Sequence, residues 1–166
     1  VRSTIGGGRC HTASGASSVV AGGTENTATG ACSTTSGGEC NDATADHSTI
    51  VGGDQNTAAG ACSVVGGRCN TVSLAGQLAG IVAGGSNTAT GLSSFVGGGH
   101  ANNATEQGSA IGGGSCNCST GKSAFIGGGI QNTAMCVTDA IAGGSGNSTC
   151  GGCSVIGGGE QNTASD

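Results

Sequence analysis

The segment SVIGGGEQNTAS, residues 154–165, contains the pattern that decides the fold of this chain. A serine and an aliphatic residue alternate, a glycine pair follows, and Asn, Thr and Ala come next. Counting back from this segment, the first glycine of an equivalent pair recurs at Gly7, Gly22, Gly37, Gly52, Gly66, Gly84, Gly98, Gly113, Gly128, Gly143 and Gly158. The interval is 15 residues except for one run of 14, 18 and 14. We therefore predict a repeat protein in which equivalent residues stack.

Each repeat has two short alternating runs separated by glycine-bearing corners, which predicts two short strands per coil. Two residues before the first glycine, the sequence predicts an inward aliphatic column: Ile5, Val20, Thr35, Ile50, Val64, Val82, Val96, Ile111, Ile126, Ile141 and Ile156. In the second run, an asparagine column is expected to hydrogen-bond from coil to coil: Asn26, Asn41, Asn56, Asn70, Asn102, Asn117, Asn132, Asn147 and Asn162. The prediction is an all-β fold, a single parallel β-solenoid (β-roll) over residues 1–166 with about 11 coils of 15 residues. The extra residues near 73–80 predict one bulged loop.

Composition removes several classes of protein. With 38 glycines, two phenylalanines and no Pro, Trp or Tyr, neither a conventional core nor a helical fold is expected. Disorder is the other interpretation of such a composition, but linkers do not keep an aliphatic column in phase. The net charge of −5 predicts no nucleic-acid partner, and the chain lacks an apolar stretch long enough for membrane insertion. We expect no enzyme and no cofactor, because His11, His47 and His100 are scattered and no nucleophile–base set emerges.

Residues 154–165 resemble the S-V-I-G-G-G-x-x-N-T-A-S-G repeats related to the heads of trimeric autotransporter (YadA-like) adhesins, which also occur in phage and giant-virus surface fibres. The resemblance implies a left-handed roll, a homotrimer, and a stalk or adhesive head at a cell or virion surface that contacts a receptor or glycan. The ten cysteines depart from the bacterial heads. A looser similarity to the N-x-V-x-G repeats of plant ice-binding proteins supplies the alternative, a secreted antifreeze protein whose partner is ice.

Two outward columns are candidate binding surfaces. Beside the asparagine column, threonines at strand spacing form the candidate ice-binding face: Thr12, Thr27, Thr29, Thr44, Thr57, Thr71, Thr88, Thr90, Thr133 and Thr163. Three residues before the first glycine, a second column is predicted to face outward and to include Ser63. It becomes apolar toward the C-terminus, where Ile81, Phe95, Phe125 and Val155 are the candidate interface for neighbouring chains.

The ten cysteines favour an oxidising, extracellular setting. Cys136 and Cys150 lie nearly one coil apart and are the candidate intrachain disulfide. Cys32 and Cys40, like Cys62 and Cys69, are half a coil apart and should sit on opposite corners, so we expect these four to bridge chains. Metal binding is the alternative for such columns. The repeat reaches both printed ends without polar capping residues, so an end-to-end polymer is an alternative to the trimer.

Overall fold

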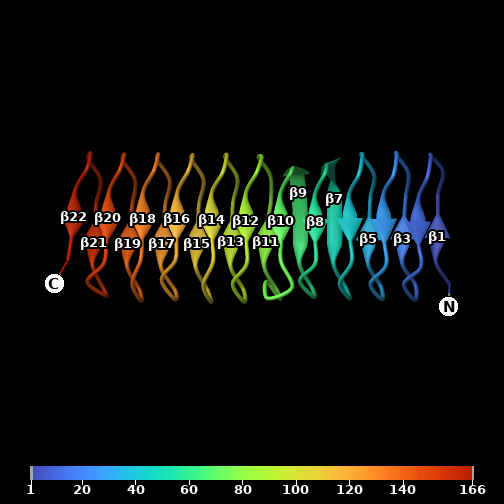
Figure 1. The fold of residues 1–166 in the computed structure, drawn as a ribbon, viewed down its shortest axis with the longest axis horizontal. Coiled ribbons are helices and arrows are strands. Elements are labelled where there is room, and N and C mark those ends of the chain that lie inside the picture. Colours follow the sequence, from blue (N-terminus) through green and yellow to red (C-terminus); the bar gives the residue numbers. More distant parts are fainter. Residues whose placement is uncertain (1, 166) are drawn as a thin grey trace.

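The computed structural model describes residues 2–165 as an all-β rod without a helix in that range (Figure 1). The chain passes from one parallel sheet to the other and back within each coil. Odd-numbered strands therefore pair only with odd-numbered strands, and even with even, in two sheets of 11 strands each. The predicted β-solenoid of about eleven coils, with two short strands per coil, is confirmed.

The strands are short because the backbone turns sharply on either side of them. Sheet A contains β1 (Thr4–Ile5), β3 (Val19–Val20), β5 (Thr34–Thr35), β7 (Thr49–Asp54), β9 (Val64–Arg68), β11 (Gly80–Ile81), β13 (Phe95–Val96), β15 (Ala110–Ile111), β17 (Phe125–Ile126), β19 (Ala140–Ile141) and β21 (Val155–Ile156). Sheet B contains β2 (Thr12–Ala13), β4 (Thr27–Ala28), β6 (Asp42–Ala43), β8 (Thr57–Ala58), β10 (Thr71–Val72), β12 (Thr88–Ala89), β14 (Asn103–Ala104), β16 (Cys118–Ser119), β18 (Thr133–Ala134), β20 (Ser148–Thr149) and β22 (Thr163–Ala164).

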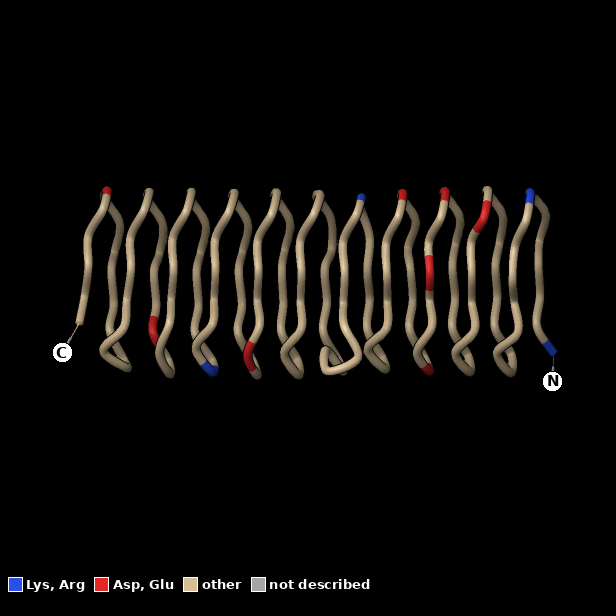
Figure 2. The backbone as a smooth tube through the Cα atoms, viewed as in Figure 1, with Lys and Arg blue, Asp and Glu red and all other residues tan. Residues whose placement is uncertain are grey.

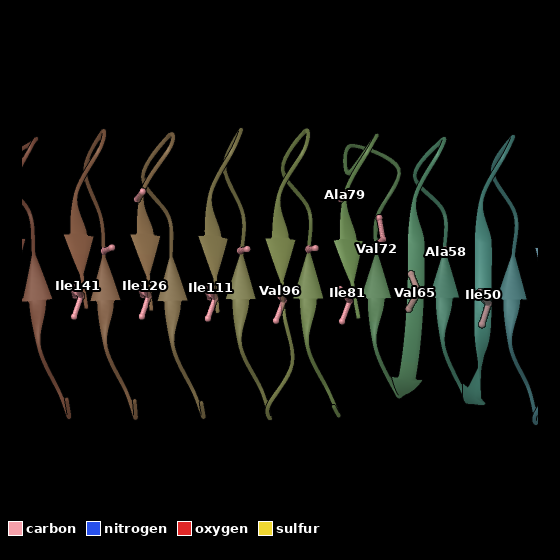
Figure 3. Packing of buried hydrophobic residues seen from close by; sticks show 14 of the residues in the cluster. Ile50, Ala58, Val65, Val72, Ala79, Ile81, Val96, Ile111, Ile126 and Ile141 are labelled. Atoms are coloured by element: carbon pink, nitrogen blue, oxygen red, sulfur yellow. The ribbon is translucent and has the colours of Figure 1, made fainter. Parts of the chain in front are cut away.

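The core is a single aliphatic layer between the two sheets. The inward residue of each sheet A strand is an aliphatic side chain in most coils, and it faces a small residue from sheet B (Figure 3). The fully buried aliphatic residues of sheet A are Val20, Ile50, Val65, Ile81, Val96, Ile111, Ile126 and Ile141. Thr35 interrupts this layer after Val20, and from Ile50 to Ile156 adjacent coils stack it continuously. Each coil there protects its neighbours from water.

The structure corrects the predicted phase in two coils. Val64 and Val82 were expected inward, but they are 45% and 60% exposed, whereas Val65 and Ile81 are fully buried. One cause is a missing residue after Val65, since Ile50 pairs with Val65 but Gly52 pairs with Gly66. The shift also buries Ser63, which was expected to face outward.

The second cause of the phase error is an alanine in a glycine position. Asn87 Nδ2 donates to the Ala83 carbonyl oxygen over 3.3 Å, as Asn102 Nδ2 donates to that of Gly98 over 3.0 Å. Ala83 therefore occupies the first glycine position of its coil, and Gly84 occupies the second. Counting from Gly84 shifted the predicted register of this coil by one residue. For that reason the prediction omitted Asn87, which belongs to the asparagine column.

Two rows of left-handed residues form the edges of the rod. We call "first edge" the row that follows each sheet A strand, with positive φ at Cys10, Glu25, Cys40, Gln55, Cys69, Ser86, Ala101, Cys116, Gln131, Gly146 and Gln161. We call "second edge" the row that precedes each sheet A strand, with positive φ at Ser17, Cys32, His47, Cys62, Leu78, Ser93, Gly108, Ser123, Thr138 and Cys153. Beside the first edge, a Cβ at Gly99 (φ 87°) would overlap the Gly114 carbonyl oxygen, so close stacking of coils requires glycine there.

The bulged loop lies on the second edge. Residues 73–79 connect β10 to β11, whereas only residues 90–94 connect β12 to β13. Pairing resumes at once, because Gly80 pairs with both Val64 and Phe95. The extra residues are therefore accommodated locally, without displacing the coils that follow.

Candidate functional surfaces

The outer side of sheet A is apolar from β7 to β21, and we call this part the apolar face. Its exposed large side chains are Val51, Val64, Val82, Phe95, Phe125 and Val155. Phe95 and Phe125 are 43% and 47% exposed, although both belong to strands. Of the predicted interface, Phe95, Phe125 and Val155 lie on this face. Ile81 does not, because it is fully buried in the core.

Charge is confined largely to the edges of the rod. Figure 2 shows acidic and basic residues mostly along the upper and lower margins. Asp42 begins β6 and is the charged residue in the strands of sheet B. At the first edge, Arg9 contacts Glu25 at 3.5 Å and Arg68 contacts Asp54 at 3.3 Å. These pairs are solvent-exposed, so each contributes little to stability. The apolar face is thus bordered by polar edges and carries no charge itself.

The outer side of sheet B carries two columns rich in hydroxyl groups, which we call the hydroxyl face. One column follows the strands from Thr12 to Thr163, and the other lies two residues further along each coil, starting at Ser14. All ten threonines of the predicted ice-binding face lie in these columns: Thr12, Thr27, Thr57, Thr71, Thr88, Thr133 and Thr163 in the first, and Thr29, Thr44 and Thr90 in the second.

The structure adds Thr105 and Thr120 to the hydroxyl face. The Thr105 N–H donates to Ser119, as the Thr90 N–H donates to Ala104, and Thr120 continues the series. Both threonines escaped detection in the sequence because their partners in the Thr-x-Thr pattern are Asn103 and Cys118. The second column therefore continues where the first is interrupted.

Interruptions of the hydroxyl face are few and chemically distinct. Asp42, Asn103 and Cys118 interrupt the first column, while Ala59, Met135 and Cys150 interrupt the second. Burial raises the pKa of the Asp42 carboxyl and of the Cys118 thiol, because both are partly covered by neighbouring strands. The interruptions are concentrated toward the C-terminal coils, so the N-terminal coils and the middle of the rod present the more regular array.

Seven of the ten cysteines occupy left-handed edge positions: Cys10, Cys40, Cys69 and Cys116 on the first edge, and Cys32, Cys62 and Cys153 on the second. All ten are free thiols. The Cys40 Sγ lies 3.6 Å from Glu25 Oε2. Desolvation, and then this carboxylate, raise the pKa of Cys40. A positive φ is uncommon for cysteine. At the two edges it allows the chain to turn tightly, and the cysteine side chains lie at the margins of the rod.

Two pairs of these cysteines are structurally equivalent. Cys32 precedes β5 on the second edge and Cys40 follows it on the first. Cys62 and Cys69 bracket β9 in the same way. The second pair is one residue closer in sequence only because of the residue missing after Val65. The Cys32/Cys40 pair and the Cys62/Cys69 pair therefore occupy equivalent positions on two coils, and we call these positions the two thiol levels. The two levels are two coils apart along the rod.

The candidate intrachain pair lies in a shallow hollow on the second-edge side of the C-terminal coils. Met135, Cys136 and Cys150 line it, with Glu106 and Lys122 at one end. The Cys136 Sγ donates to the Cys150 carbonyl oxygen at 3.1 Å, and no disulfide is formed. Buried Asp139 fixes this turn by accepting from the N–H groups of Cys136 and Ser154, both at 3.0 Å. The Cys136–Cys150 bond stays a prediction.

Within residues 2–165, no three His, Cys, Asp or Glu side chains are grouped so as to hold a metal ion. That range also contains no helix long and apolar enough to cross a membrane. The fold and its two contrasting faces define a β-solenoid repeat protein. Comparison with known families gave no matching family, and no curated protein matches the sequence.

Proposed function

We propose that this chain is a non-enzymatic structural segment of an extracellular or virion surface fibre, and that it self-associates through its apolar face. The observation that carries the proposal is the row of exposed valines and phenylalanines on the outer side of sheet A. Eleven strands spaced ~4.8 Å apart give a rod of about 50 Å, which suits a spacer or stalk. The resemblance to trimeric adhesin heads supports a homotrimer at a cell or virion surface, contacting a receptor or glycan.

The extent of the apolar face supports self-association. Its large side chains run over eight strands of sheet A, from β7 to β21, which is about 35 Å of the rod. Its lack of charge means that a second, equally uncharged face could cover it without desolvating an ion. A contiguous apolar surface of this kind usually marks a contact site on a soluble protein.

Light scattering under reducing conditions tests the proposal. We expect the wild-type chain to form an oligomer of defined mass, and Phe95→Ser combined with Phe125→Ser to shift it to monomer. Met135→Ser is the matched control, because Met135 is 42% exposed but lies on the hydroxyl face. A wild-type chain that stays monomeric at high micromolar concentration would contradict the proposed self-association.

Ice binding is the second candidate function, and the continuity of the hydroxyl face favours it. Thr105 and Thr120 extend the second column past the interruptions in the first. Hydroxyls repeat at ~4.8 Å along the rod and about 7 Å across it, a flat array able to order surface water. In this case the chain is a secreted antifreeze protein and ice is its partner.

An ice-growth assay separates the two functions. If the hydroxyl face binds ice, the wild-type chain should shape growing crystals, and Thr88→Lys should abolish the effect by placing a long charged side chain on the array. Thr34→Lys is the control, since Thr34 lies on sheet A on the opposite side of the rod. Equal loss of ice shaping in both variants would exclude the hydroxyl face as the cause.

A further inference from the structure

We propose that neighbouring copies join edge to edge, parallel and in register, through disulfides from Cys32 to Cys40 of the next copy and from Cys62 to Cys69 of the next copy. The inference rests on the proposed self-association and specifies its contacts. It assigns a role to the four edge thiols, which cannot bridge within one chain because β5 or β9 separates the members of each pair.

The level of each thiol along the rod carries the proposal. Cys32 and Cys40 stand at the two ends of the same sheet A strand, and Cys62 and Cys69 at the two ends of another. When two parallel rods lie side by side without an axial shift, the first edge of one meets the second edge of the other. Each Cys40 then meets a Cys32 and each Cys69 meets a Cys62, at two levels simultaneously.

The coil between these two levels also fits. There the second edge presents His47, and the first edge presents Asp54 and Gln55. An imidazole opposite a carboxylate and an amide gives a polar contact between the two thiol levels. In the sequence, Cys32 directly follows Ala31 and Cys62 directly follows Ala61. Small side chains therefore flank the second-edge thiols.

An antiparallel arrangement is less favourable. It would place like edges together, and on the first edge Cys10, Cys40 and Cys69 could all pair at once only about a two-fold axis at Cys40. That register would set Glu39 against Glu39 of the other copy and Arg9 against Arg68. Like charges directly opposite each other oppose association, so the charge pattern supports the parallel arrangement.

Parallel edge contacts also explain how the apolar face becomes covered. The first edge meets a different edge on its neighbour, so the contact is heterologous and either continues as a ribbon or closes into a ring. Every copy in the ring turns the same sheet toward the axis. Closure at three copies encloses three apolar faces, with Phe95 and Phe125 inside and the hydroxyl faces outside.

The bond requires an oxidant, and we name a small-molecule disulfide. The Cys32 thiolate attacks it, forms a mixed disulfide and releases one small thiol. The Cys40 thiolate of the next copy then attacks the Cys32 sulfur and releases the second small thiol. Two protein thiols lose two protons and two electrons in total, and the small disulfide gains them.

The test is oxidation with a glutathione redox buffer, followed by non-reducing electrophoresis and mass spectrometry of the linked peptides. We expect a ladder that ends at the trimer, with Cys32–Cys40 and Cys62–Cys69 as the main links. Cys32→Ser combined with Cys62→Ser should abolish the ladder. Cys10→Ser combined with Cys116→Ser is the matched control and should leave it intact. Serine already occupies equivalent edge positions, such as Ser17 and Ser86, so both variants should fold.

The two proposals fail in different ways. If the reduced protein self-associates but the links form mainly through Cys10, Cys116 or Cys153, the edge pairing is wrong and the self-association stands. A ladder whose Cys40 links join Cys40 to itself would also overturn the parallel register. If the reduced protein is monomeric and oxidation yields no specific link, the proposed function fails as well.

Discussion

The side-chain amide of Asn102 takes part in five hydrogen bonds, and this residue shows how the coils are held in register. The two N–H groups of its Nδ2 are shared among three acceptors, Asn87 Oδ1, Gly98 O and Gly114 O. Its Oδ1 accepts from the backbone N–H and the Nδ2 of Asn117. One buried amide thus connects three coils and satisfies the carbonyl oxygens exposed by the glycine corner. A chain with almost no aromatic residues depends on such polar stacking.

We expect Asn102→Ala to destabilise the fold by about 2–4 kcal/mol, because it leaves several buried polar groups without partners. Asn103→Thr, one residue away, is the matched control. Asn103 lies half-buried in an outward column that is otherwise rich in threonine, and its Oδ1 has no hydrogen-bond partner among the residues that the structure describes, so its replacement should cost little. Chemical denaturation of the two variants measures the difference, and an equal effect at both positions would contradict the role of the ladder.

Asp42 gives a pH-dependent prediction. Burial raises the pKa of this carboxyl, so the folded chain binds its proton more tightly than the unfolded chain does. Ionisation of Asp42 therefore opposes folding, and this loss of stability is present at neutral pH and disappears as the pH falls through the raised pKa. We expect Asp42→Thr to stabilise the fold at pH 7 by about 0.5–1 kcal/mol.

Denaturation of Asp42→Thr at several pH values checks this sign. Its advantage over the wild-type chain should shrink as the pH is lowered toward the acid range. Glu39→Gln, at the exposed first edge, is the control and should leave stability nearly unchanged. An advantage that grows with acidification would contradict the proposed cause.

At the scale of the strand, the side-chain alternation makes neighbouring residues energetically unequal. Ile81 is fully buried and Val82 is 60% exposed, although they are adjacent and both aliphatic. We expect Ile81→Ala to cost about 2–5 kcal/mol and Val82→Ala less than about 0.5 kcal/mol in the reduced monomer. Thermal unfolding of both variants tests the corrected phase directly. If Val82→Ala were the more destabilising of the two variants, Val82 would be the inward residue, as the glycine count predicted.

The repeat predicted the solenoid, its two strands per coil and most of its inward columns. A 15-residue period with alternating inward and outward side chains leaves few other folds that bury the limited apolar surface of this chain. It failed where glycine was used as the marker. Ala83 makes the same backbone contact as a glycine in other coils, and the residue missing after Val65 shifts the count in the other direction. Asparagine was the better marker, since its hydrogen bonds define the register.

The binding surfaces were less predictable than the core. A slip of one residue moves a side chain to the opposite face. The count from Gly84 therefore placed buried Ile81 outside and exposed Val82 inside, and the count from Gly66 placed exposed Val64 inside. Thr105 and Thr120 were overlooked because their strand partners are not threonines. Edge positions such as Cys32 and Cys40 were placed correctly on opposite corners, but their equivalence to Cys62 and Cys69 required the observed pairing of coils.

At the scale of the whole molecule, every strand contacts only the adjacent strands of its own sheet and of its own or the next coil. Local changes in chain length should therefore have local effects. We expect deletion of Leu74 and Ala75, which lie exposed in the loop of residues 73–79, to leave the β-content and the melting temperature almost unchanged. Circular dichroism measures both, and a large loss of structure would show that the loop supports more than its own coil.

The same nearest-neighbour pairing determines how the rod would respond to force. Backbone hydrogen bonds between coils point along the long axis, so tension applied at the two ends loads the coils in series. The bonds of one coil break together while the next coil stays intact. Each step would release about fifteen residues, roughly 50 Å of extended chain. A stretched rod of this construction would therefore lengthen in discrete increments and absorb mechanical work at each one.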